Sequence, residues 1–218
     1  MSASAEHVIY VHGLWLSGAE SLFLRRRLAQ ETGFTTHTFS YPTVTSSMAE
    51  VAERLNAFVT KLGAQRLHLV GHSLGGLVIY RFLERFPAQA PGRVVFLGTP
   101  AVASRAAVAA ARNRWIATLV GRCVSEELLK EQGRRWQAAR ELGIIAGTQR
   151  LGLGQFFAQF EEDCDGTVAV SETRMPGATD HITLPVSHMG MMLSARVARE
   201  TAYFLQNGRF SFGPVRSI

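Results

Sequence analysis

The stretch Leu67-His-Leu-Val-Gly71-His-Ser73-Leu-Gly75-Gly-Leu-Val78 decides which fold we expect for this chain. It joins an apolar β-type run to a helical segment through a turn of the form G-x-S-x-G, with Ser73 at its centre. Glycines on both sides relieve the crowding of a strained turn, which lets the serine hydroxyl project above the end of the strand. The stretch therefore predicts a nucleophilic serine at a strand–turn–helix junction. A glycine-rich turn with a capping serine is the simpler alternative.

On both sides of this stretch, short apolar runs alternate with helical patterns. This alternation predicts βα units, and hence an α/β fold with a mostly parallel central sheet flanked by helices. A helix that Ser46 or Ser47 opens should run to about residue 62. We further expect strands at residues 7–11, 34–41, 67–70, 94–97, 143–147 and 181–186, and helices at 18–30, 75–86 and 191–205.

Residues 101–142 interrupt the alternation, because they are rich in Ala, Arg and Glu and carry no strand signal. They predict a short helical insert at the position of a cap or lid. We therefore expect residues 1–218 to form a single domain with a cap insert at about 101–142.

The composition of the chain excludes two broad classes of protein. With 47% hydrophobic residues and mixed charge, the 218 residues are too apolar for a disordered chain. No apolar run approaches the roughly 18 residues that a membrane span needs. The start of the chain shows no export signal, and Cys123 and Cys164 lack metal-ligand spacing, so we expect free thiols and a cytoplasmic location.

Histidine supplies the general base that a serine nucleophile needs, and His188 is the best candidate. It follows the last expected strand directly, so that it would share one edge of the sheet with Ser73. His72 cannot serve, because its side chain should point away from the hydroxyl of its neighbour. We expect no catalytic role for the other histidines that we considered: His68 should support the fold, and His7 and His37 should be exposed to solvent.

An aspartate is expected to orient this histidine, and all three aspartates lie between Ser73 and His188, where serine hydrolases with a parallel sheet carry the acid. Asp165 is preferred, because a loop that turns at Gly166 after a strand end can aim a carboxylate at an imidazole. Asp163 is the alternative, although its acidic neighbours favour solvent. Asp180 should lie at the opposite end of the last strand.

Backbone N–H groups are expected to form an oxyanion hole. One donor should be the N–H of Leu74, which follows the nucleophile. The second should be the N–H of Leu14, because Gly13 directly after the first strand lets the backbone approach closely. The side chains of Leu14 and Trp15 would then line the acyl pocket.

These segments together resemble the α/β-hydrolase superfamily, in particular its small bacterial lipases and esterases. The match covers about residues 7–206 and includes His12-Gly13, the Gly71–Gly76 turn, Asp165-Gly-Thr-Val and His188, in that order. Gly98-Thr-Pro100 is also similar to a Gly-Thr-Pro that many bacterial lipases carry.

The resemblance implies cleavage of carboxylic esters through an acyl-enzyme, with no cofactor. A thioesterase or acyltransferase with the same triad is the alternative, and a non-catalytic binding protein on this fold is a weaker one. Many secreted lipases hold calcium through an aspartate soon after the catalytic histidine. Here Gly190 and Met191 follow, and no acidic residue comes before Glu200, so a metal site has no support.

The charge of the chain is concentrated in one region. Residues 101–150 carry 9 basic and 4 acidic side chains, which is +5 of the total of +6. A basic helix with Trp115 and Trp136 can lie on an anionic membrane surface, whereas a solvated lid face is the simpler interpretation. No nucleic-acid motif accompanies the arginines, so the expected partner is a small-molecule or lipid ester and not a nucleic acid.

Overall fold

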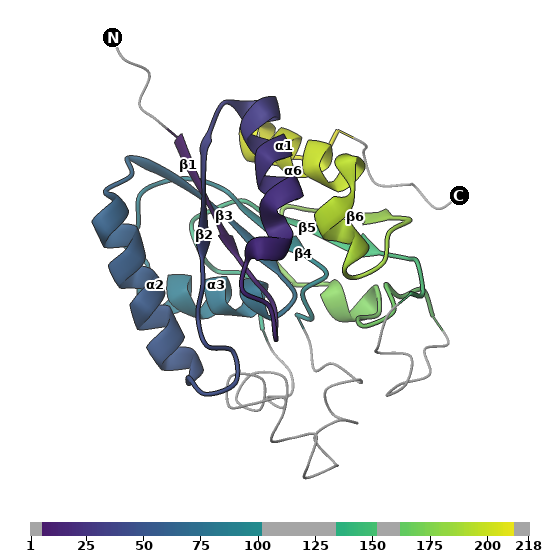
Figure 1. Ribbon diagram of the computed structural model, residues 1–218, viewed down its shortest axis with the longest axis horizontal. Helices are drawn as coiled ribbons and strands as arrows, with labels where there is room; N and C mark the ends of the chain where they lie inside the picture. Colours follow the sequence, from purple (N-terminus) through teal and green to yellow (C-terminus); the bar gives the residue numbers. More distant parts are fainter. Residues whose placement is uncertain (1–5, 102–133, 152–161, 212–218) are drawn as a thin grey trace.

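Six strands form a single sheet in the computed structural model, which describes residues 6–101, 134–151 and 162–211 (Figure 1). The strand order is β2-β1-β3-β4-β5-β6, and every neighbouring pair is parallel. The predicted α/β fold with a mostly parallel sheet is therefore confirmed. The strands are β1 (Glu6–Val11), β2 (Thr35–Phe39), β3 (Arg66–His72), β4 (Val94–Leu97), β5 (Leu142–Gly147) and β6 (Asp180–Leu184).

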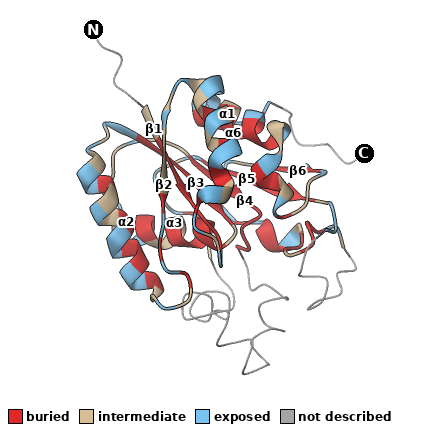
Figure 2. Cartoon of the chain, viewed as in Figure 1, coloured by how far each residue is buried: buried red, intermediate tan, exposed pale blue. Residues whose placement is uncertain are grey.

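Helices cover both faces of this sheet, because successive strand side chains point to opposite sides. Ile9 and Val11 belong to the core beneath helices α2 and α3, whereas Val8 and Tyr10 belong to the core beneath α1 and α6. Figure 2 shows buried strands between helices that expose their outer faces. The helices are α1 (Leu22–Thr32), α2 (Met48–Leu62), α3 (Leu74–Arg85) and α6 (Ala195–Asn207), with short 3-10 turns η1 (Ala19–Ser21), η3 (Ser171–Thr173) and η4 (Gly190–Leu193).

Element boundaries differ from the predicted ones where side chains leave the regular pattern. The strand predicted at 34–41 ends at Phe39, because the Tyr41 ring stacks on the His12 ring instead of continuing the ladder. The last helix does not begin at Met191. A 3-10 turn comes first, and α6 begins after Ser194, whose hydroxyl accepts a hydrogen bond from the Val197 N–H.

The insert predicted at 101–142 falls largely on residues 102–133, which lie outside the described residues, so the cap stays a prediction. Residues 134–141 are described and are not helical. Trp136 is buried against Phe96, its indole N–H donates to the Arg140 carbonyl, and the Arg140 guanidinium donates to the Leu67 and Ala90 carbonyls. The prediction that Trp136 belongs to a membrane-facing basic helix is therefore wrong, since Trp136 packs in the core of the fold. Trp115 lies outside the described residues.

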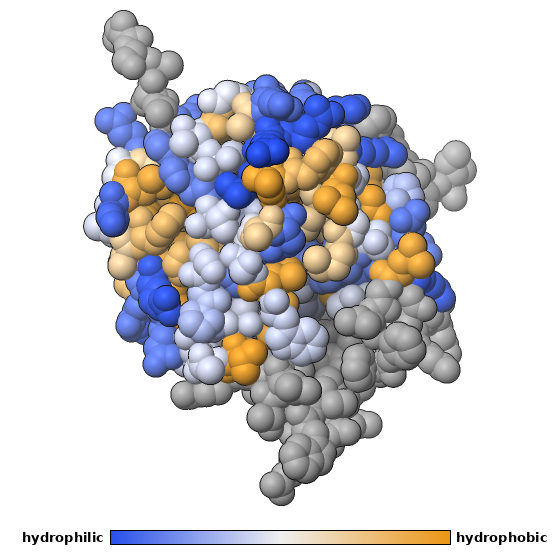
Figure 3. All heavy atoms as spheres, viewed as in Figure 1, coloured by the Kyte–Doolittle hydropathy of each residue, from blue (hydrophilic) through white to orange (hydrophobic). Residues whose placement is uncertain are grey.

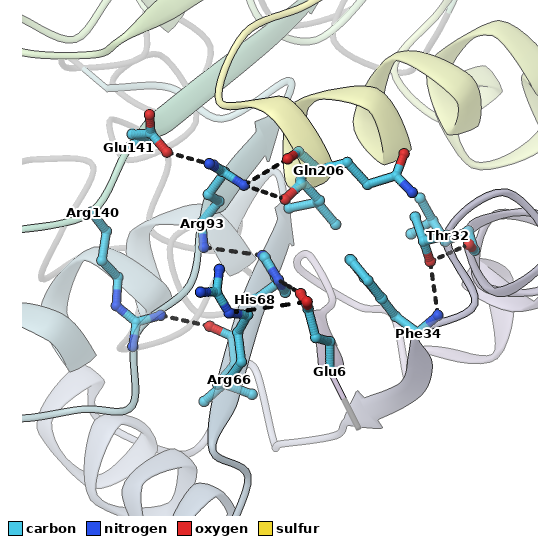
Figure 4. Close-up of polar contacts among 12 residues, drawn as sticks. Glu6, Thr32, Phe34, Arg66, His68, Arg93, Arg140, Glu141 and Gln206 are labelled. Atoms are coloured by element: carbon cyan, nitrogen blue, oxygen red, sulfur yellow. Dashed lines mark hydrogen bonds and ion pairs between the residues drawn. The ribbon is translucent and has the colours of Figure 1, made fainter. Parts of the chain in front are cut away.

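A polar network closes the amino-terminal edge of the sheet (Figure 4). His68 is fully buried, its Nε2 lies 2.8 Å from Glu6, and its Nδ1 accepts a hydrogen bond from the Arg93 N–H. The Arg93 guanidinium donates to the carbonyls of Leu205 and Gln206 at the end of α6. The predicted fold-supporting role of His68 is thus confirmed.

His7 and His37 do not sit in solvent as predicted. Both are half-buried, their rings stack with centroids 5.2 Å apart, and His7 Nδ1 lies 2.9 Å from His37 Nε2. Burial, followed by the neighbouring His7, lowers the pKa of His37. This pair links β1 to β2 at the edge of the sheet.

None of the helices in the described ranges is both long and apolar enough to cross a bilayer. The cytoplasmic location stays a prediction.

Candidate active site

Ser73 occupies a strained turn between β3 and α3. Its φ of 53° and ψ of −123° are unusual for a residue with a side chain, and its N–H donates to the Leu97 carbonyl over 2.9 Å. A Cβ atom on Gly75 would lie 2.1 Å from the Val11 carbonyl oxygen, and one on Gly71 would lie 2.6 Å from the Gly76 Cα. The two glycines of the motif are therefore required by close approach of the backbone.

The sheet order places Ser73 at a topological switch point. The chain passes from β1 outward to β2 and then returns to β3 on the other side of β1. In open parallel sheets, such a reversal opens a crevice at the carboxyl ends of the two central strands. Gly13 follows β1, and a Cβ atom on it would lie only 3.0 Å from the Ser73 Cβ. The turn after β1 thus adjoins the predicted nucleophile.

A buried acid–base pair lies at the same edge of the sheet. His188 Nδ1 is 2.7 Å from Asp165 Oδ2, and the His188 N–H donates to the Asp165 carbonyl over 2.9 Å. The N–H groups of Thr167 and Val168 donate to the other carboxylate oxygen, Oδ1. Because an ionised carboxylate only accepts hydrogen bonds, this arrangement assigns a proton to Nδ1 of His188, so that Nε2 is the acceptor in the neutral imidazole.

The other two aspartates lie elsewhere. Asp163 is exposed. Asp180 is the first residue of β6, at the amino-terminal end of the strands, where its carboxylate accepts a hydrogen bond from the Phe210 N–H. Within the described part of the chain, Asp165 is the aspartate hydrogen-bonded to His188.

Two residues near the pair have roles that the sequence did not reveal. A Cβ atom on Gly98 would lie 2.9 Å from Asp165 Oδ2 and 3.1 Å from His188 Nδ1, and Gly98 has a φ of 55°. His72 Nε2 lies 3.1 Å from the His188 carbonyl oxygen, a contact that the sequence analysis did not predict. The similarity to the Gly-Thr-Pro of bacterial lipases drew attention to Gly98 but did not indicate that it packs against Asp165 and His188. No sequence signal connects His72 to His188.

Leu14 and Trp15 lie in the turn after β1, and Leu74 begins α3 directly after Ser73. The Leu74 N–H is the first of α3, and the first N–H groups of a helix have no partner within it. Leu14 follows Gly13 directly. Trp15 has a φ of 60°, is 58% exposed, and donates its backbone N–H to the Thr43 hydroxyl. The oxyanion-hole role of the two leucines and the pocket-lining role of Trp15 stay predictions.

His12 stabilises the turn that carries Leu14. Its Nδ1 lies 2.9 Å from the Gly13 carbonyl oxygen, its Nε2 accepts from the Tyr41 N–H, and the Tyr41 hydroxyl donates to the His12 carbonyl. Burial lowers the pKa of His12. A neutral imidazole that donates at one nitrogen and accepts at the other fits these contacts.

The all-parallel sheet, the strained serine turn after β3 and the layers of helices on both faces define an α/β-hydrolase architecture. The chain belongs to the alpha/beta hydrolase family, whose sequence model matches residues 8–203. The family resemblance inferred from the motifs is therefore confirmed, and the family indicates a hydrolase.

Similar solved structures share this fold. The mature lipase BlEst2 of Bacillus licheniformis is 19% identical with a TM-score of 0.69, over 95% of this chain and 93% of that one. Carboxylesterase CesB of Bacillus subtilis is 17% identical with a TM-score of 0.59, over 94% and 84%. The thioesterase RedJ of Streptomyces coelicolor is 13% identical with a TM-score of 0.61, over 95% and 86%. No functionally curated protein matches this chain significantly.

Proposed function

We propose that this protein is a serine hydrolase that cleaves carboxylic esters through an acyl-enzyme. The observation that carries the proposal is the buried contact of 2.7 Å between His188 Nδ1 and Asp165 Oδ2, at the edge of the sheet where Ser73 occupies its strained turn. Ser73 is half-exposed and can meet substrate, whereas His188 and Asp165 are shielded. A reactive hydroxyl beside an oriented base is the arrangement that acyl transfer requires.

The reaction follows in two steps. His188 Nε2 takes the proton of the Ser73 hydroxyl as its oxygen attacks the ester carbonyl, and Asp165 stabilises the imidazolium that forms. The N–H groups of Leu14 and Leu74 hold the oxyanion. The C–O bond to the alcohol then breaks, and His188 returns the proton to the leaving alcohol. Water, deprotonated by the same histidine, cleaves the acyl-enzyme to the free acid and restores the serine.

Exposed apolar side chains support an ester with a hydrophobic acyl group. Such side chains occur in segments that follow the carboxyl ends of β1, β5 and β6, which is the edge that carries Ser73. Figure 3 shows that apolar side chains on the displayed face lie beside α1 and also toward α2, with strongly hydrophilic side chains over the upper part of α1. An apolar rim beside a polar reaction centre is the usual composition of a ligand site. The exposed large side chains are Trp15, Leu22, Phe23, Leu151, Met189 and Leu193.

Covalent labelling tests the proposal directly. A fluorophosphonate probe should label the wild-type protein, and Ser73→Ala should abolish both the labelling and the hydrolysis of p-nitrophenyl butyrate. Ser171→Ala, which alters an exposed serine outside the site, serves as the matched control and should behave as wild type. Labelling or wild-type hydrolysis by Ser73→Ala would contradict the proposal, and so would an unlabelled wild-type protein, which is the outcome expected of a non-catalytic binding protein.

A thioesterase or acyltransferase is the second candidate, and the fold similarity to the thioesterase RedJ favours it. Both reactions share the acylation of Ser73 and differ in the leaving group or the acceptor. A panel of p-nitrophenyl esters, glycerides and acyl-CoA thioesters, run with and without an alcohol acceptor, separates the candidates. Esters should be cleaved with the highest kcat/KM if the first proposal is correct.

A further inference from the structure

His72 lies directly before Ser73, yet its side chain contacts a segment 116 residues further along the chain. Its Nε2–H donates to the His188 carbonyl over 3.1 Å. The two rings also touch, with centroids 4.7 Å apart and planes inclined by 44°. His72 thus connects the end of β3, which carries Ser73, to the loop after β6, which carries the base.

The opposite side of the His72 ring faces the turn after β1. A Cβ atom on Gly13 would lie 3.3 Å from His72 Nδ1, and this nitrogen has no hydrogen-bond partner among the described residues. Nε2 donates and Nδ1 has no acceptor among the described residues, so a neutral imidazole with its proton on Nε2 fits these contacts. The ring therefore lies between the turn that adjoins Ser73 and the loop of the base.

Packing alone does not require an imidazole at this position. His72 is 1% exposed, and a buried nitrogen without a partner is unfavourable. A leucine would fill similar space without burying a polar nitrogen that lacks a partner. Burial and the neighbouring His188 lower the pKa of His72 well below its usual range, so His72 adds no positive charge beside the imidazolium that His188 forms during the reaction.

The anchors of His188 show what this hydrogen bond adds. The His188 N–H donates to the Asp165 carbonyl, and its ring nitrogen Nδ1 bonds the Asp165 carboxylate. Both anchors belong to one residue, so the pair can shift as a unit without breaking either of them. The bond from His72 is the described hydrogen bond that ties His188 to the strand leading into Ser73.

We propose that His72 is a positioning residue, which sets the distance between the His188 imidazole and the Ser73 hydroxyl by donating to the His188 carbonyl. The inference rests on the proposed function, because it assigns Ser73 and His188 to one reaction. Displacement of a reacting group by about 1 Å can slow an enzyme about 100-fold, so loss of the bond should act on kcat.

The test compares three substitutions of His72 with p-nitrophenyl butyrate as substrate. His72→Leu removes the donor and keeps most of the volume. His72→Gln carries its amide N–H₂ to about the position of Nε2, whereas His72→Asn carries it only to about that of Nδ1. We expect His72→Leu and His72→Asn to lower kcat about 10- to 100-fold with KM within about twofold, and His72→Gln to recover at least tenfold over His72→Asn.

Unchanged kcat in His72→Leu, or equal kcat in His72→Gln and His72→Asn, would overturn the inference. If His72→Leu does not fold, the two amides still decide the matter, because they differ by one methylene. Wild-type labelling by the fluorophosphonate probe is measured first. A wild-type protein that does not label contradicts the proposed function, whereas a labelled one with amide variants of equal kcat contradicts the role of His72 alone.

Discussion

Asp165 uses its two carboxylate oxygens for separate tasks. Oδ1 accepts the N–H groups of Thr167 and Val168, which fixes the orientation of the carboxylate, and Oδ2 faces His188 Nδ1. The two backbone donors thereby decide which oxygen is free for the histidine. An isosteric amide at this position would be oriented by the same donors.

Asp165→Asn should therefore keep the fold and lose most of the ester-hydrolysing activity. The amide oxygen of the new asparagine would take the place of Oδ1, and its N–H₂ group would face His188 Nδ1. Nδ1 would then have to accept a hydrogen bond, so the neutral imidazole would carry its proton on Nε2 instead. A histidine protonated at Nε2 cannot accept the Ser73 proton. We expect kcat to fall about 10³- to 10⁴-fold with an unchanged circular dichroism spectrum.

Asp163→Asn is the matched control, because Asp163 is exposed two residues away. Its kcat should remain within about twofold of the wild type. Near-normal kcat in Asp165→Asn, or a large loss in Asp163→Asn, would show that Asp165 does not orient the base.

At the residue scale, sequence patterns pointed to Ser73 and His188, which follow strands, and to Asp165, which precedes the turn at Gly166. They did not indicate the contacts of Gly98 or His72. Those contacts join segments from different strands, and their spacing along the chain carries no period that a local pattern could detect. The site is therefore predictable as a set of candidate side chains and much less so as a packed arrangement.

At the element scale, α2 begins with a reciprocal capping arrangement. The Ser47 hydroxyl accepts from the Glu50 N–H over 3.3 Å, and the Glu50 carboxylate accepts from the Ser47 N–H over 2.7 Å. Both bonds satisfy N–H groups that a helix start leaves without partners. The sequence prediction of Ser46 or Ser47 as the start is thus confirmed for Ser47.

Ser47→Ala should destabilise the protein by about 1 kcal/mol without changing the hydrolysis rate at saturating ester. Urea unfolding followed by circular dichroism measures the loss. Ser47→Thr keeps a capping hydroxyl and should lose less. A stability equal to wild type in Ser47→Ala would mean that the cap contributes nothing to folding.

The elements themselves were more predictable than their ends. Five of the six strand positions followed from apolar runs bounded by turn residues, and the strand at 34–41 followed from its alternation of Thr with Phe and Tyr. α2 followed from its helical period and its cap. The 3-10 turn η4 was missed because Met191 continues the apolar pattern, whereas the cap at Ser194 decides where α6 begins. The position of β2 outside β1 could not be predicted, since it depends on which strand pairs form and not on any one strand.

At the scale of the whole molecule, buried or half-buried histidines make stability depend on pH. Burial lowers the pKa of His181 from its ordinary value of 6.5 to about 4. Between these values the unfolded chain binds protons that the folded chain does not, so acidification favours unfolding. The stabilisation is fully present above pH 6.5 and is lost progressively below it. Burial lowers the pKa in the same direction for His12, His37, His68 and His72.

The free energy of unfolding should therefore fall as the pH is lowered from about 7.5 to about 5. Urea midpoints measured across this range in constant ionic strength provide the test. His181→Gln should show a shallower decline than the wild type, because it removes one of the groups that take up a proton on unfolding. A midpoint that stays level or rises on acidification would contradict the prediction.

The contact between α1 and α6 has a consequence for synthesis on the ribosome. Leu24 and Leu28 of α1 share one apolar core with Val197 and Phe204 of α6, and Arg93 bonds the carbonyls at the end of α6. The apolar face of α1 therefore stays uncovered until α6 has been synthesised. All the side chains proposed for the chemistry have been made once His188 has left the ribosome, but the nascent chain cannot close this core until α6 emerges. The residues proposed for catalysis are thus synthesised before the helix that completes the fold around them.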